Sequence, residues 1–169
     1  MLRTDPWSEG LPKRCARITA LFLLHAALSL AAVNQPVQFP HNTHMKLGLA
    51  CVDCHTGADI RAAAGIPSVT KCMLCHAKLA TNKPEVKKVI QYAQKGEEIP
   101  WRRVYGFSSD AHVKFRHAPH FEANISCATC HGEMSQETVA VRSIDFTMGT
   151  CLTCHRQRKA SQDCAACHY

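Results

Sequence analysis

The sequence predicts a mostly irregular fold with a small α-helical content, in which a few short helices surround a core that side chains alone do not supply. Cysteine usage is the first observation, because ten of the eleven cysteines occur in pairs with two residues between them. The second is periodicity: in one segment apolar residues recur with the period of a helix, and in no segment do apolar and polar residues alternate as in a β-strand. The third is size, since residues 32–169 offer little apolar surface for a core of their own.

Each cysteine pair is followed at once by a histidine, so the motif C-x-x-C-H occurs five times. This motif is the attachment signal of c-type haem. The two thiols add to the porphyrin vinyl groups, and the adjacent histidine ligates the iron. We therefore predict five covalently attached haem c groups, which form the core of the fold. The predicted attachment residues are Cys51, Cys54, His55, Cys72, Cys75, His76, Cys127, Cys130, His131, Cys151, Cys154, His155, Cys164, Cys167 and His168.

Two other uses of paired cysteines predict different patterns. Structural zinc needs four ligands in a tetrahedron, and five pairs do not divide into fours. Zinc also has no need of a histidine directly after every second cysteine. A disulfide framework suits a small exported chain, but it explains neither the uniform two-residue gap nor the histidine. Haem attachment accounts for both features.

A second motif, F-x-H-x-x-H, stands six residues ahead of two of the attachment sites, at Phe39–His44 and Phe115–His120, and the copies are 76 positions apart. Each iron needs a second axial ligand beyond the motif histidine. Histidines three apart on a helical turn point in related directions, so we expect one to reach its own module's haem and the other a neighbouring haem. Phe39 and Phe115 then pack either on porphyrin or as ordinary core aromatics.

The histidine count closes if every iron is bound by two histidines. Only His25, which lies in an apolar run, stays outside the set. His112 enters by count alone, and Met148, three residues before Cys151, is the alternative fifth distal ligand. Methionine opposite histidine would raise that haem's potential. The predicted iron ligands are His55, His76, His131, His155 and His168 within the motifs, and His41, His44, His112, His117 and His120 outside them.

The chain divides into an N-terminal segment, 1–31, and a pentahaem domain, 32–169. We expect a first two-haem module at 39–76, a second at 112–155 and a fifth haem at 156–169. The first 17 residues are charged, and an apolar run follows over 18–33. This pattern predicts a signal peptide cleaved near Ala31, with an uncleaved N-terminal membrane anchor as the alternative. Either outcome exports the haem domain to the periplasm or the outer face of the cytoplasmic membrane.

Residues 84–95 (PEVKKVIQYAQK) form the one clear helical pattern. Pro84 suits the first turn, Val86, Val89 and Ile90 lie on one face, and Gly96 suits the stop. Short helical turns are expected around the C-x-x-C-H segments. The formal net charge of +7 does not indicate nucleic-acid binding, because the propionates of five haems largely offset it.

Several phrases carry a resemblance to a known family: FPHNTH, AGIPSVTKCMLCH, IPWRRVY, HVKFRHAPH, CATCHGEM and FTMGTCLTCHR. They resemble small class III multihaem cytochromes c, and more closely the pentahaem cytochrome subunit of alternative complex III-like quinol oxidoreductases. The resemblance implies that His41 and His117 ligate the haems of His55 and His131. It also implies redox protein partners, with a membrane quinol-oxidising complex among them.

Electron transfer is the function that this arrangement predicts. Two histidines on each iron leave no open position for a substrate, so we expect an electron carrier and no catalytic residues, in a periplasmic or membrane-associated respiratory chain. The alternative is a multihaem reductase, which requires one haem with an open axial position.

Overall fold

The computed structural model describes residues 33–169. The chain divides into two units, 1–31 and 32–169, and the expected signal peptide or anchor lies outside the described residues. Within 33–169 the backbone is helical or irregular, and its one β-pairing is an isolated bridge between Val113 and His168. The predicted fold class is therefore confirmed. No helix in this part of the chain is long and apolar enough to cross a membrane.

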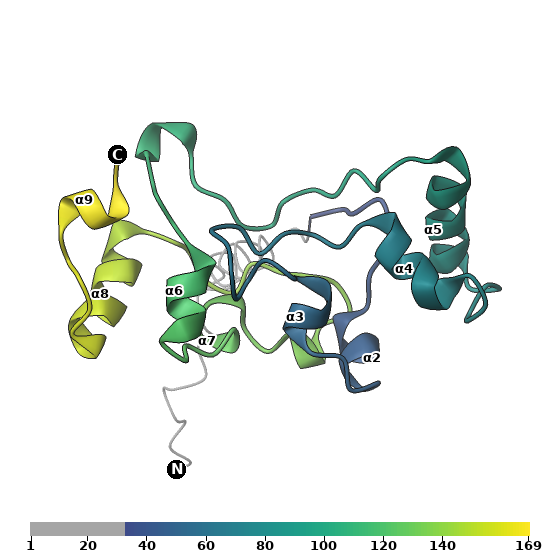
Figure 1. Cartoon of the computed structure of the whole chain (residues 1–169), viewed down its shortest axis with the longest axis horizontal. Coiled ribbons are helices and arrows are strands. Elements are labelled where there is room, and N and C mark those ends of the chain that lie inside the picture. Colours follow the sequence, from purple (N-terminus) through teal and green to yellow (C-terminus); the bar gives the residue numbers. More distant parts are fainter. Residues whose placement is uncertain (1–32) are drawn as a thin grey trace, which may run out of the picture. The chain divides into compact units, whose positions relative to one another are not determined.

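Short helices are joined by long irregular segments (Figure 1). Two 3₁₀ turns, η1 (Ser109–Ala111) and η2 (Met134–Gln136), lie in these segments. The α-helices are α2 (His41–Met45), α3 (Cys51–Cys54), α4 (Val69–His76), α5 (Pro84–Lys95), α6 (His117–Glu122), α7 (Ala128–His131), α8 (Met148–Arg158) and α9 (Cys164–Cys167).

Helix α5 has the bounds that the sequence predicts. Pro84 is its first residue, where a missing N–H leaves no helical hydrogen bond unmade. Gly96 ends the helix in the left-handed conformation, with φ 68°. Val89 is the buried residue of its apolar face.

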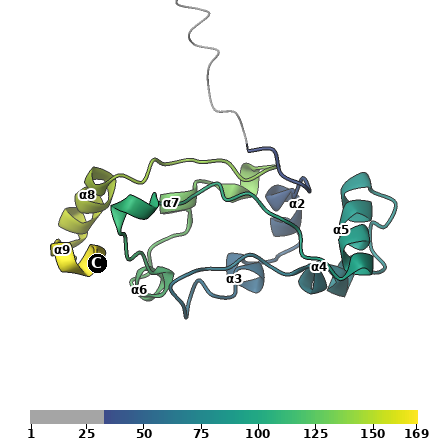
Figure 2. The same cartoon turned by 90° about the horizontal axis from the view of Figure 1, so that it is seen from above.

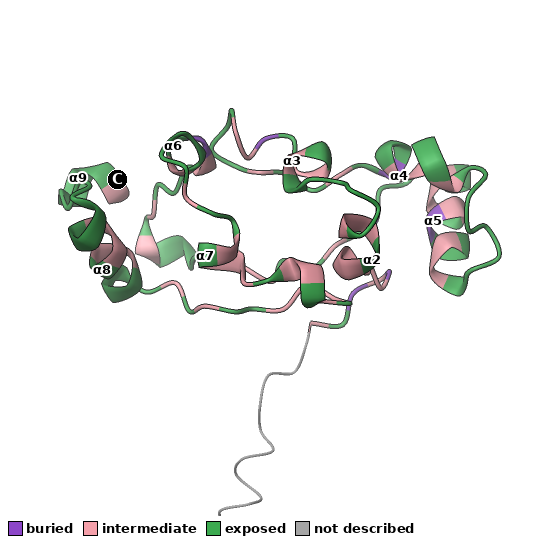
Figure 3. Cartoon of the chain, turned by 90° about the horizontal axis from the view of Figure 1, so that it is seen from below, coloured by how far each residue is buried: buried purple, intermediate pink, exposed green. Residues whose placement is uncertain are grey.

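Side chains build only a small core, at the α4–α5 end of the described unit. Val37, Val69, Val89 and Ile99 are its buried residues. Cys72, Met73, Tyr92, Ala93 and Trp101 pack against this cluster. Elsewhere in residues 33–169 buried positions are sparse (Figure 3). Protein packing of this extent does not stabilise the 137 described residues by itself, which agrees with a fold built around attached groups.

Gln35 fastens the start of the described chain to the segment after α5. Its side-chain amide donates to the Arg102 carbonyl at 2.7 Å, and its side-chain oxygen accepts from the Arg102 N–H at 3.0 Å. Gln35 is itself buried, and each such bond contributes about 0.5–1.5 kcal/mol.

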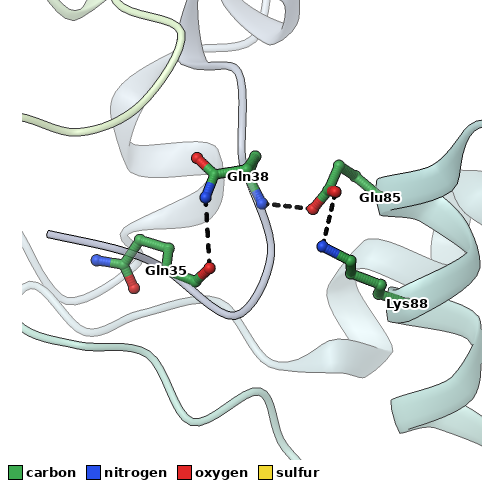
Figure 4. A network of polar contacts seen from close by, with 4 residues as sticks. All are labelled: Gln35, Gln38, Glu85 and Lys88. Atoms are coloured by element: carbon green, nitrogen blue, oxygen red, sulfur yellow. Dashed lines mark hydrogen bonds and ion pairs between the residues drawn. The ribbon is translucent and has the colours of Figure 1, made fainter. Parts of the chain in front are cut away.

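The neighbouring Gln38 ties the same segment to helix α5. Its backbone N–H donates to Glu85 at 2.6 Å, and Glu85 also accepts from Lys88 at 2.7 Å (Figure 4). Together with the Gln35 bonds, these contacts hold residues 35–38 against the α4–α5 core.

Two reciprocal backbone hydrogen bonds join the halves of the described unit. The Asn42 N–H in the first turn of α2 donates to the Glu137 carbonyl at 2.9 Å. The Ala118 N–H in the first turn of α6 donates to the Arg61 carbonyl at 3.1 Å. The two donors are 76 positions apart, and so are the two acceptors. This is also the spacing of the F-x-H-x-x-H copies. Such reciprocity is the mark of an approximate two-fold relationship between the halves.

Candidate haem-attachment sites

Each C-x-x-C-H motif forms a helical turn that brings its two thiols to one side. In the first, third and fifth motifs the histidine N–H donates to the carbonyl of the first cysteine, at 2.8, 2.9 and 2.9 Å. Residues three apart on such a turn are neighbours on its surface. The turn therefore presents two thiols and, one residue on, an imidazole, as covalent attachment and iron ligation together require.

Three of the motif helices begin at a side-chain cap. Ser68 accepts from the Lys71 N–H ahead of the second motif. Thr147 accepts from the Thr150 N–H ahead of the fourth, and Asp163 from the Ala165 N–H ahead of the fifth. Each cap satisfies one of the amides that a helix leaves unbonded in its first turn, so the polar residue before each motif sets where its helix begins.

The two F-x-H-x-x-H segments adopt the same aromatic packing. The Phe39 ring meets the His41 ring edge-on at 4.8 Å and stacks on the His44 ring at 4.3 Å. In the second copy the Phe115 ring lies 4.8 Å from both of its histidine rings, edge-on to the first and tilted by 32° to the second. The phenylalanine of the motif thus spaces the two imidazoles, a role that neither of our sequence-based alternatives included.

Most of the ten candidate ligand histidines use Nδ1 to donate to a backbone carbonyl. A carbonyl only accepts, so Nδ1 carries the proton and Nε2 keeps its lone pair. Metal-binding histidines are oriented in this way, and the bond raises the basicity of the ligating nitrogen. The pairs are His44 with Pro40, His55 with Gly65, His76 with Leu79, His117 with Ala62, His120 with Arg116, His155 with Ser161, and His168 with Ala111.

Three motif histidines each face one histidine of an F-x-H-x-x-H segment at a similar distance. Two imidazoles that each place Nε2 about 2 Å from one metal ion hold their ring centroids roughly 6 Å apart. The observed centroid distances fit one iron between each pair. The pairs are His44 and His76 at 6.0 Å, His120 and His155 at 6.1 Å, and His117 and His131 at 6.3 Å.

His41 lies near the first motif and is the histidine whose Nδ1 is buried without a hydrogen-bond partner among the described residues. Burial lowers the pKa of His41, and the nearby His55 and His44 lower it further. Each effect favours the neutral imidazole, the form that binds a metal.

His131 is oriented by aromatic contacts, and no carbonyl among the described residues accepts from its Nδ1. Burial lowers the pKa of His131, with smaller contributions from His117 and His55. The Tyr105 ring meets the His131 ring edge-on at 4.9 Å, and the Tyr105 hydroxyl accepts from the Ser143 N–H at 2.6 Å. Sequence reasoning assigned Tyr105 no role, because its only sequence signal is the phrase IPWRRVY.

His112 and Met148 occupy different surroundings. His112 adopts a left-handed conformation beside the fifth motif, and its carbonyl accepts from the Tyr169 N–H at 3.2 Å. The Ala111 carbonyl just before it is the partner of the His168 imidazole. Met148 is the first residue of α8 and is exposed.

A cleft of about 480 Å³ opens beside the third motif. Cys127 and His131 line it together with Cys51 and with Phe121 of α6. Its volume is within the range of cofactor pockets. The histidine geometry and this cleft both fit haem at the motifs.

The alternative uses of the cysteines gain no support from the described part of the chain. All ten motif cysteines there are free of disulfides. No group of three histidine, cysteine or acidic side chains in residues 33–169 comes together as a zinc site would require.

Comparison with known proteins shows which families the chain is similar to. Residues 24–99 match the class III cytochrome c family, and residues 113–169 match cytochrome c7 and related cytochromes c. The relative is described as "Menaquinone reductase, multiheme cytochrome c subunit", from Nitratidesulfovibrio vulgaris strain Hildenborough. It is 31% identical over 163 residues, which cover 80% of this chain and 77% of the relative.

Proposed function

Because the chain belongs to the multihaem cytochromes c of the class III type, we propose that it is a pentahaem electron-transfer protein whose irons are each held between two histidines. Haem c, when bound, supplies a reversible one-electron couple. The polypeptide attaches, orients and spaces the five groups. The observation that carries the proposal is the set of three histidine pairs at 6.0 to 6.3 Å, each joining a motif histidine to one from an F-x-H-x-x-H segment.

The remaining ligands follow from position. His41 and His55 are the positions equivalent, 76 residues earlier, to the facing pair His117 and His131. His112 lies in the chain segment that bonds to the fifth motif. The proposed pairs are His41 with His55, His44 with His76, His117 with His131, His120 with His155, and His112 with His168.

Histidine on both sides of an iron fills its axial positions and leaves none for a substrate. Hydrogen bonds from Nδ1 to carbonyls make the ligating nitrogens more basic. More basic ligands stabilise ferric iron and lower the reduction potential. These properties suit a carrier of single electrons at low potential.

We propose that the partner is a membrane complex that exchanges electrons with a quinone. The relative is a subunit of a menaquinone reductase, and its alignment covers most of both chains. Reduction of a quinone to quinol takes two electrons and two protons. This chain would supply or accept the electrons one at a time, from the periplasmic side, and the protons would pass through the partner.

Two measurements test the proposal. The mature protein, produced with c-type haem maturation, should carry five haems by mass. When oxidised, all of its haems should be low-spin, and when reduced, none of them should bind carbon monoxide. A menaquinol or menaquinone analogue should exchange electrons with the haems in a detergent-extracted complex but not with the isolated chain. Fewer than five haems, or one that binds carbon monoxide, would refute the pentahaem carrier. Exchange by the isolated chain would refute the need for a membrane partner.

A further inference from the structure

The halves of the described unit meet at the first and third attachment motifs. The reciprocal bonds from Asn42 to Glu137 and from Ala118 to Arg61 hold the F-x-H-x-x-H helix of each half against the other half. Cys51 and Cys127 are equivalent positions, 76 apart, and both line the cleft beside the third motif. The first and third motifs are therefore neighbours across the approximate two-fold axis.

The second motif lies on the outer side of the first. His44, from the helix that precedes the first motif, faces His76 of the second at 6.0 Å. Cys54 of the first motif lines one pocket with Ser68 and Lys71, which stand at the start of the helix that carries the second motif. Beyond the second motif lie α5 and the small apolar core.

The fourth motif repeats this relationship in the other half. His120 faces His155 at 6.1 Å. The Tyr105 ring contacts both His131 of the third motif, at 4.9 Å, and Phe146, which lies two residues before α8 and the fourth motif, at 5.1 Å. Two-fold symmetry therefore relates the second motif to the fourth, each outside a central one.

The fifth motif extends the row beyond the fourth. The His155 Nδ1 of the fourth motif donates to the Ser161 carbonyl, three residues before α9 begins at Cys164. The Lys114 backbone N–H donates to the Cys167 carbonyl at 2.8 Å, and the Lys114 Nζ donates to the Ala165 carbonyl at 2.8 Å. The segment 111–114 thereby fixes α9 at this end of the unit.

Two perpendicular views agree on the resulting order. Along the unit, α5 and α4 are followed by α3, then by α6 and α7, and α8 and α9 lie side by side at the far end (Figures 1 and 2). The second motif of the sequence is thus the first in space.

From this geometry we infer that the five haems form one row. The haems of the second motif, Cys72–His76, and of the fifth, Cys164–His168, are the two ends. The haems of the first, third and fourth motifs lie between them in that order. The inference rests on the proposed pentahaem function. Electron tunnelling falls steeply with distance, so neighbours in space set the route. An electron donated by a reduced partner at one end leaves to an oxidised one-electron acceptor at the other, with no change in protons or ligands. Electrons therefore enter or leave the row at the haem of the second motif as well as at the haem of the fifth. The position of the second motif in the sequence does not indicate this role.

Proton NMR of the fully reduced, diamagnetic holoprotein tests this order. Dipolar contacts between haem substituents should link the second site with the first, the first with the third, the third with the fourth, and the fourth with the fifth. A contact between the second and third sites, without one between the first and third, would overturn the inferred row. If the protein carries fewer than five haems, the proposed function fails; if it carries five with a different contact map, only the order fails.

Paramagnetic resonance of two variants gives an independent readout. In the Cys51→Ala/Cys54→Ala variant the haem at His76 should lose its magnetic neighbour and give an uncoupled spectrum. In the matched Cys127→Ala/Cys130→Ala variant it should stay coupled to the haem at His55. Haem counts of four per chain confirm that each variant has folded. The reverse pattern would overturn the order.

Discussion

The imidazole rings of His117 and His131 lie nearly parallel, with an angle of 9° between their planes and 6.3 Å between their centroids. The rings of His44 and His76 are separated by a similar distance but cross at 72°. The anisotropy of a low-spin ferric haem depends on the angle between its two axial imidazole planes. Parallel planes give a rhombic resonance, and planes near perpendicular give a strongly anisotropic one.

This difference gives an assignable spectroscopic prediction. The Cys127→Ala/Cys130→Ala variant should lose a rhombic signal from the oxidised protein, and Cys72→Ala/Cys75→Ala should lose a strongly anisotropic one. Electron paramagnetic resonance at low temperature measures both. Loss of the anisotropic signal in the first variant would show that the His117 and His131 rings are not the axial pair.

The choice between His112 and Met148 is open to a direct comparison. His112→Ala should leave one haem high-spin and able to bind carbon monoxide. Met148→Leu should leave all five low-spin, because ten histidines already supply two ligands for each of five irons and leucine keeps the volume and helix preference of methionine. Optical titration with carbon monoxide measures both. A carbon monoxide-binding haem in the Met148 variant alone would assign the ligand to methionine.

The two backbone hydrogen bonds that join the halves predict slow hydrogen exchange at the amides that donate them. Amides in the first turn of a helix have no partner within the helix and usually exchange fast. Asn42 and Ala118 lie in first turns but donate across the junction at 2.9 and 3.1 Å. Their exchange should be at least about tenfold slower than that of Val52 and Thr70, first-turn amides with no partner in the described chain. Hydrogen–deuterium exchange followed by NMR measures the difference. Equal rates would mean that the junction opens freely.

Gly132 is predicted to be irreplaceable beside His131. It has φ 71° and ψ −176°, a region open almost only to glycine. A Cβ there would lie 2.9 Å from the Ser143 Cβ and nearer still to its hydroxyl, which donates to the His131 carbonyl at 3.0 Å. Gly132→Ala should therefore lower the free energy of unfolding by about 1–3 kcal/mol. It should also change the rhombic resonance signal of the haem at His131.

Gly96→Ala is the matched control for that substitution. Gly96 also has a positive φ, 68°, but a Cβ added there would meet no atom within 4 Å. The substitution should cost about 1–2 kcal/mol and leave the rhombic signal unchanged. Equal effects of the two substitutions on that signal would remove the steric argument.

The contact between Glu85 and Gln38 predicts a pH dependence. Burial alone would raise the pKa of Glu85, but hydrogen bonds from Lys88 and from the Gln38 N–H outweigh it and hold the pKa below its usual value of 4.5. The stabilisation is therefore present above pH 4.5 and is lost as pH falls through the lower folded-state pKa. Because the pair is partly exposed, the effect should be about 0.2–1 kcal/mol.

Exchange protection of the Gln38 amide is the measurement for this contact. Protection should fall on acidification in the unmodified protein and should be smaller and nearly independent of pH in Glu85→Gln. Glu97→Gln, at an exposed carboxylate beyond the other end of α5, is the control and should behave as the unmodified protein does. An unchanged acid response in Glu85→Gln would rule out the carboxylate as its source.

Local chemistry is what the sequence by itself determined. A C-x-x-C-H segment forms the same helical turn wherever it occurs, because the turn depends on hydrogen bonds within five residues. Helix α5 likewise follows from Pro84, one apolar face and Gly96. The two F-x-H-x-x-H copies could be recognised as equivalent from their letters, and their common packing of Phe39 and Phe115 on the histidines follows from residues two and five positions apart.

Which motif lies beside which was decided only by the tertiary structure. Five copies of the C-x-x-C-H pattern do not indicate which copies are adjacent in the folded chain. Their order depends on contacts between distant residues, such as Asn42 with Glu137 and His117 with Ala62. The role of Tyr105 against His131 arises in the same way, across 26 positions of irregular chain. No local period encodes such contacts, because the backbone amides and aromatic edges that make them are available in any sequence and acquire partners only when the halves assemble.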